Sequence, residues 1–105
     1  AGISCTLTQV ATDSVNLSRA DGLAFDNFGN LFVAREILGS LGGLSYVNVN
    51  NGNTTNLMSL TGVDQVELLA NGDLIITSEL SGAATTNRIY QVDMTYDASN
   101  IPIFY

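Results

Sequence analysis

Two pairs of acidic residues recur at the same spacing, and they are the side chains in this sequence best suited to chemistry. Asp21 is followed by Asp64, and Glu36 by Glu79, each 43 positions later. Paired carboxylates can separate their pKa values in a shared site, so Glu36 and Glu79 are candidates for a general acid and base. Structural roles explain the same residues. Each Glu can be a solvated strand end, and each Asp can make a hydrogen-bonded turn before its strand.

Missing residue types exclude several other kinds of site. The chain of 105 residues has no histidine, which excludes Ser-His-Asp and Cys-His catalytic groups and histidine-bearing zinc sites. Its single cysteine, Cys5, cannot form an internal disulfide. It is either a small buried hydrophobic residue or half of an intermolecular bridge. We assign no catalytic residue and no organic cofactor site, and the sequence does not point to an enzyme.

Charge is strongly unbalanced, with ten acidic residues and a net charge of −7. Such a surface repels phosphate backbones and anionic membranes, so no nucleic-acid partner is expected, whereas cations such as Ca²⁺ are natural partners. The alternative interpretation is that the acidity only maintains solubility. The longest apolar runs are far too short to span a membrane. A lysine-free chain rich in Asn, Thr and Ser predicts an extracellular or cell-surface location, where the sequons at Asn16 and Asn53 would be glycosylation candidates.

The acidic pairs belong to a longer repeat. Residues 20–62 and 63–105 align without a gap. An ungapped period of this length is typical of repeated supersecondary units, although generic hairpins can also fall into register by chance. The identical pairs are Asp21/Asp64, Gly29/Gly72, Leu31/Leu74, Glu36/Glu79, Gly39/Gly82 and Val49/Val92.

Each unit divides into four β-rich runs separated by turn residues. Gly29 is expected to adopt the left-handed conformation in its turn, and Asn71-Gly72 is a hairpin signal. Pro102 lacks a backbone donor, which makes the last strand an outer edge. The expected strands are 22–26, 30–36, 44–49 and 54–60 in the first unit, and 65–69, 73–79, 88–94 and 101–105 in the second.

These runs resemble the blades of a known superfamily. The segment ADGLAFDNFGNLFVA resembles the blade motif of the NHL and SMP-30/gluconolactonase-like six-bladed β-propellers, and NRIYQVD is similar to the third strand of those blades. The resemblance covers residues 20–105. It implies an all-β fold of tandem four-stranded antiparallel β-propeller-like blades.

The chain supplies about two and a half blades, whereas a closed propeller needs roughly four to eight, so the ring is incomplete. Residues 20–62 are blade-like repeat 1, and residues 63–105 are blade-like repeat 2. Residues 1–19 are the orphan outer strands of a partial blade, expected at 3–10 and 14–17, and form a candidate donor segment for a neighbour's edge.

The resemblance also implies a metal site. In the SMP-30/gluconolactonase-like enzymes, carboxylate and amide oxygens hold a divalent metal on the propeller axis, and one ligand is the Asp of a DG that opens an inner strand. By this resemblance Asp21 is a metal ligand, with Asp64 at the same height on the next blade, and both suit Ca²⁺. The second unit departs from the motif because Gln65 replaces Gly22. The other ligands of the family would lie on blades outside this chain.

An incomplete ring leaves sheet faces and strand edges open. We therefore predict a secreted acidic β-repeat structural protein that self-associates through open blade edges into an extracellular assembly, a homo-oligomer or a filament. The alternative is part of an SMP-30/gluconolactonase- or NHL-like propeller with a central divalent-metal site, acting as a hydrolase or a ligand-binding module. A compact monomer, such as a small sandwich of two sheets, is a third arrangement.

Overall fold

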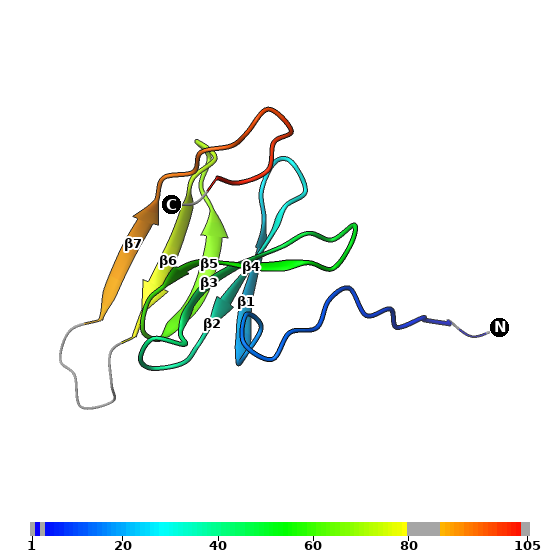
Figure 1. The fold of residues 1–105 in the computed structure, drawn as a ribbon, viewed down its shortest axis with the longest axis horizontal. Coiled ribbons are helices and arrows are strands. Elements are labelled where there is room, and N and C mark those ends of the chain that lie inside the picture. The colour runs from blue at the N-terminus through cyan, green and yellow to red at the C-terminus, as the bar shows by residue number, and fades with distance from the viewer. Residues whose placement is uncertain (1, 3, 80–86, 104–105) are drawn as a thin grey trace.

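All regular structure in the described part of this chain is β-sheet. The computed structural model describes residues 2, 4–79 and 87–103, and these contain seven strands and no helix. The predicted all-β class of tandem antiparallel sheets is confirmed (Figure 1). In chain order the strands are β1 (Ala20–Phe25), β2 (Leu31–Arg35), β3 (Gly43–Val47), β4 (Thr54–Ser59), β5 (Val63–Leu68), β6 (Leu74–Ser78) and β7 (Arg88–Val92).

Within each sheet, every strand pairs with its neighbour in the chain. The first sheet has the order β1-β2-β3-β4 and the second has the order β5-β6-β7. The register shifts near the start of β1, between Ala20 and Gly22, and near the start of β5, between Val63 and Val66. Such β-bulges redirect side chains at the end of a strand. Both bulges contain the aspartate that recurs in the sequence.

The predicted hairpin turns form where glycine permits them. Gly29 and Gly72 have φ angles of +83° and +93°, in the region that glycine adopts without steric cost. In the first turn, one carboxylate oxygen of Asp26 accepts hydrogen bonds from the backbone N–H groups of Phe28 and Asn30, at 2.8 and 2.9 Å. These turns set the β1–β2 and β5–β6 hairpins, as expected from the sequence.

The core lies between the two sheets. Phe32 of β2 and Leu44 of β3 are fully buried on one face of the first sheet, and Val66 and Ile76 of the second sheet pack against them. These residues fall at the alternating positions that place side chains on one face of a strand. The β1–β2 hairpin therefore packs directly against β5.

The sheets approach each other closely at Gly22. A Cβ atom built there would lie 2.7 Å from the backbone carbonyl oxygen of Asp64 and 3.2 Å from Cα of Gln65. Only a residue without a side chain fits this crossing. Gln65, which replaces glycine in the second unit, is exposed.

The opposite face of the first sheet is apolar and only partly covered. Leu23 and Phe25 lie on it, paired with Val33 and Leu31, and they are 63% and 57% exposed. Residues 9–11 of the N-terminal segment lie beside this face. We call it the open face of the first sheet.

A turn at residues 14–19 covers the polar end of the open face. Asp13 starts this turn by accepting a hydrogen bond from the backbone N–H of Asn16 at 2.6 Å. The buried Arg35 side chain donates to neutral oxygens, among them the hydroxyl of Ser45. Ser45 in turn donates to the backbone carbonyl of Asn16 at 2.5 Å. This network fixes the N-terminal turn on β2 and β3.

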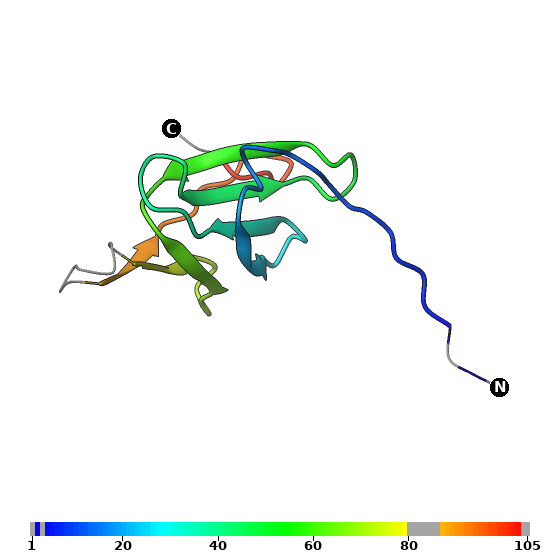
Figure 2. The same cartoon turned by 90° about the horizontal axis from the view of Figure 1, so that it is seen from below.

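The strands expected before residue 20 do not form. Within residues 4–19 there is no strand, so the prediction of outer blade strands at 3–10 and 14–17 is wrong for the described residues. Residues 4–10 are exposed, and residues 4–8 extend away from both sheets (Figures 1 and 2). A strand forms only against a partner edge, and residues 4–10 pair with no strand among the described residues of their own chain.

The fourth strand expected in the second unit is reduced to a short hairpin. Tyr96 and Pro102 form an isolated β-bridge around a turn at residues 97–101. The missing N–H of Pro102 limits the ladder there. The side-chain amide of Asn30 donates to the carbonyl of Asn100 at 2.8 Å and ties this hairpin to the first sheet.

Three smaller expectations concern Cys5, residues of the expected strands and repeat, and membrane spans. Cys5 is exposed, so its interpretation as a small buried residue is wrong. Residues 3, 82, 104 and 105, which belong to expected strands or to the repeat, lie outside the described residues. In the part of the chain that the structure describes, we find no helix with the length and apolar character needed to cross a membrane.

Candidate functional site

Three carboxylates meet where the two sheets begin. Asp21 lies in the bulge of β1, Glu36 directly follows β2, and Asp64 lies in the bulge of β5. One oxygen of each lies within 4.8 Å of the others. We call these three residues the carboxylate cluster. The structure thus brings together Asp21 and Asp64, the two predicted metal ligands, and adds Glu36, which the sequence offered only as an acid–base candidate.

Backbone pairing explains this convergence. The first residue of β1, Ala20, is paired with Arg35, the last residue of β2, so the next residues along the chain meet at one end of the hairpin. The backbone N–H of Glu36 donates to the carbonyl of Arg19 at 3.1 Å and fixes that end. Packing of β1 on β5 then brings Asp64 to the same place.

The three carboxyl groups shift one another's pKa values. Hydrogen bonds from Asp64 and then Glu36 lower the pKa of Asp21 below its usual value. The same bond to Asp21 raises the pKa of Glu36, and so does the negative charge of Asp64. The pKa of Asp64 is raised, first by its bond to Asp21 and then by desolvation. Like charges this close cannot all ionise freely, and Asp21 keeps its charge most readily.

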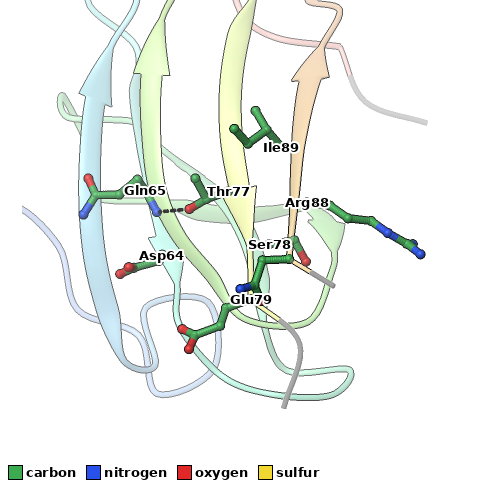
Figure 3. Close-up of a pocket in the computed structure, with 8 residues that line it drawn as sticks. Asp64, Gln65, Thr77, Ser78, Glu79, Arg88 and Ile89 are labelled. Carbon is green, nitrogen blue, oxygen red and sulfur yellow. Dashed lines mark hydrogen bonds between the residues drawn. The ribbon is translucent and has the colours of Figure 1, made fainter. Parts of the chain in front are cut away.

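Glu79 adds a fourth negative charge next to the cluster. It directly follows β6, and its backbone N–H donates to the carbonyl of Gly62 at 2.8 Å. Its charge raises the pKa values of Glu36 and Asp64, although it is not their largest influence. Figure 3 shows the Asp64 carboxylate directed toward β1, and the Arg88 guanidinium pointing away from it. All four recurring acidic residues therefore lie at one end of the sheets.

The spacing of the cluster fits a hard divalent cation. Ca²⁺ binds oxygen ligands at about 2.4 Å, so two oxygens bound to one ion are at most about 4.8 Å apart. The oxygens of Asp21, Glu36 and Asp64 meet that limit. They would supply three of the six to eight oxygens that Ca²⁺ takes, with water or further groups completing the shell.

The cluster can also hold and release a proton. Carboxyl groups with separated pKa values are able to act as an acid and a base. An open pocket beside Asp64 is lined by Thr77, Glu79 and Ile89 (Figure 3). The solvated-strand-end interpretation fits Glu79, which is exposed, better than Glu36, which is half-buried.

The two glycosylation candidates lie in different surroundings. Asn53 is exposed in the β3–β4 turn. Asn16 is half-buried, and its side-chain nitrogen donates to the hydroxyl of Thr54 at 3.2 Å. A glycan is attached through that nitrogen, so modification of Asn16 would disturb this contact, whereas Asn53 is free to accept one.

Comparison with known proteins relates the fold to propellers. No protein-family model matches the chain, and no curated protein matches it. The chain is similar to the solved structure of the PQQ-bound form of aldose sugar dehydrogenase from Streptomyces coelicolor, with a TM-score of 0.64 and 22% sequence identity over 88% of the chain. That enzyme is a β-propeller. The fold of this chain is propeller-like. The chain spans 28% of the length of that enzyme, and at this identity the similarity shows the fold alone.

Proposed function

We propose that this chain is an extracellular structural module that associates with copies of itself through its open sheet faces and edges. It contains two propeller-like sheets, whereas a closed propeller needs roughly four to eight. Repeats at the ends of an open array expose surface that neighbours would bury. Copies that stack in the same direction form a ring if the rotation closes, and a filament if it does not.

The observation that carries this proposal is the open face of the first sheet. Leu23 and Phe25 lie next to each other on it, 63% and 57% exposed. Removing apolar surface from water stabilises an interface by about 25 cal/mol per Å². Adjacent exposed apolar side chains on a sheet face are typical of an association surface.

The second sheet offers a matching face. Ile89 is 70% exposed and pairs with Thr77, and Ile75 lies on the same face beside Gln91. This face points away from the core between the two sheets. We propose that it receives the open face of the first sheet of the next copy. Such a contact joins two different surfaces, so it propagates from copy to copy.

We further propose that the two sheets are blades of the NHL and SMP-30/gluconolactonase-like type, working outside the cell. The DG of Asp21 and Gly22 and the hairpin around Gly29 support the blade type. The lysine-free acidic composition supports the location.

Light scattering coupled to size-exclusion chromatography tests the association. We expect species larger than the 11.1 kDa monomer, and Leu23→Asp should shift them toward the monomer by placing a charge in the interface. Leu38→Asp is the matched control, because Leu38 is similarly exposed, at 55%, but lies in the β2–β3 connection. A folded wild-type chain that stays monomeric at every concentration would remove the proposal.

A second candidate function is binding of a divalent cation such as Ca²⁺, as in the alternative of a propeller with a central metal site. The carboxylate cluster favours it through oxygen spacing and donor chemistry. Asp21, Glu36 and Asp64 would hold the ion, which would supply a fixed positive charge to a bound ligand or to a neighbouring blade.

Calorimetric titration with Ca²⁺ tests this candidate, with thermal melting as a second readout. Asp21→Asn and Asp64→Asn should each abolish the binding heat and the calcium-dependent rise in melting temperature. Glu67→Gln removes a charge from the same strand as Asp64 and should leave both signals unchanged. Equal responses in the cluster variants and the wild type would rule out the site.

A further inference from the structure

We propose that residues 4–10 of one copy add to the outer edge of β7 in a second copy, as the fourth strand of its second sheet. This inference rests on the self-association proposed above and names the segment and the edge that meet. Addition of an extended segment to an open strand edge uses main-chain hydrogen bonds for affinity and side-chain pockets for specificity.

The receiving edge is open in the described structure. The first sheet has four strands and the second has three, and within residues 4–79 and 87–103 only β6 pairs with β7. The C-terminal hairpin pairs residues 95–97 with 101–103, and among the described residues it does not pair with β7. A strand with free N–H and C=O groups on one side is a template for another chain.

An apolar groove runs beside this edge. Tyr90 and Val92 of β7 line one side of it, Ile76 of β6 forms its base, and Met58 and Leu60 at the end of β4 line the other side. A fourth strand in the second sheet would direct its inward side chains into this groove. The groove therefore favours an added strand with an apolar side chain at an inward position.

Residues 4–10, Ser-Cys-Thr-Leu-Thr-Gln-Val, fit both the edge and the groove. All seven are exposed, and Leu7 is 100% exposed. The segment contains no glycine, proline or charged residue, and its Thr and Val residues favour strands. Seven extended residues span roughly 23 Å, enough to cover the five residues of β7. Leu7 is the central residue and the one with an apolar side chain long enough for the groove.

The segment is placed to reach another copy rather than its own β7. Figures 1 and 2 share the long axis of the molecule, and in both the N-terminal segment and β7 lie at opposite ends of it. The segment leaves the body beside the open face of the first sheet, where Val10 and Ala11 lie near Leu23. That face is the one proposed to stack on the second sheet of the next copy. The same stacking thus carries residues 4–10 toward the neighbour's β7.

The pairing has a defined register. Every ladder among the described strands is antiparallel, and an antiparallel fourth strand with Leu7 beside Tyr90 directs Leu7 into the groove. Thr6 then lies opposite Gln91 on the other face of the sheet. Residues directly opposite each other in an antiparallel pair have Cβ atoms about 4.5–5.5 Å apart, close enough for a disulfide after small adjustments.

Cysteine crosslinking tests this register on the full chain. Two single-cysteine chains are prepared separately: Cys5→Ser/Thr6→Cys and Cys5→Ser/Gln91→Cys. They are then mixed and oxidised with oxidised glutathione. We expect a mixed disulfide dimer on a non-reducing gel. The control partner is Cys5→Ser/Leu38→Cys, which places the thiol at an exposed position in the β2–β3 connection and should give at least tenfold less mixed dimer.

A second variant tests the groove by association strength. Leu7→Asp should raise the dissociation constant of the assembly about tenfold or more, because it puts a charge in place of a leucine that the groove buries in the assembly. Leu38→Asp, which places the same charge at an exposed leucine in the β2–β3 connection, should leave it unchanged.

The outcomes separate the two proposals. A monomeric wild-type chain overturns both. A chain that associates, but gives no excess of the Thr6–Gln91 crosslink and no response to Leu7→Asp, overturns strand addition and leaves association through the sheet faces standing. In a chain that carries both cysteines, a disulfide formed within one molecule overturns the assignment to a second copy.

Discussion

Replacing Gly22 with alanine tests how closely the two sheets pack. The added Cβ would lie 2.7 Å from the carbonyl oxygen of Asp64, 3.2 Å from Cα of Gln65 and 3.3 Å from the backbone N of Val66. All three are backbone atoms, so no side chain can swing away to make room. Overpacking of this kind costs about 1–3 kcal/mol. The loss of backbone freedom in the unfolded state offsets about 0.4–1 kcal/mol of this cost.

We therefore expect Gly22→Ala to destabilise the fold by about 1–2 kcal/mol. For a domain of this size, each 1 kcal/mol lowers the melting temperature by about 4–8 °C. Thermal and urea unfolding followed by circular dichroism measure the change. The matched control is Gly2→Ala, since a Cβ at Gly2 meets nothing within 4 Å. If Gly22→Ala were as stable as the wild type, the close crossing of β1 and β5 would be refuted.

Three further changes probe other parts of the molecule. Hydrogen bonds from the backbone N–H of Asn16 and its neighbours lower the pKa of Asp13, so the stability that Asp13 provides is present above its ordinary value of 3.8 and is lost as pH falls through the lowered value. The difference in melting temperature between the wild type and Asp13→Asn should therefore be largest near neutral pH and shrink in acid, and a difference that grows in acid would contradict this. Leu44→Ala empties part of the fully buried core and should cost about 2–5 kcal/mol in urea unfolding, while a cost under about 1 kcal/mol would contradict the assigned core. Asn30→Ala removes the 2.8 Å bond to the carbonyl of Asn100, and faster amide hydrogen exchange in residues 97–101 should report it, whereas unchanged exchange would show that other contacts hold the hairpin.

The seven strands were predictable from local chemistry. Glycines at 29 and 72 and runs such as LFVAR and LIITS mark hairpins by turn type and alternation, and they form where expected. The errors fall where pairing depends on a distant partner. Residues 4–10 have strand-forming composition but pair with no strand in the described part of their own chain, and Pro102 weakens the last ladder.

The candidate site was predictable only in part. The repeat pointed to Asp21 and Asp64, but it kept Glu36 in a separate pair with Glu79. Their convergence depends on two bulges and on packing between sheets, which side-chain types alone do not reveal. The signal available in the sequence was that Asp21 and Glu36 sit at the two ends of one hairpin.

The order of the strands also bears on how the chain acquires its structure during synthesis. Because every ladder among the described strands joins strands that are adjacent in sequence, the first sheet can form completely from a continuous stretch that ends at Ser59. Short-range contacts of this kind form quickly, and domains are built from the N-terminus as the chain leaves the ribosome. The partly synthesised chain would then expose the apolar inner face of the first sheet, with Phe32 and Leu44, until β5 emerges from the ribosome and covers it. During that interval, nascent chains are most prone to aggregate through this exposed face.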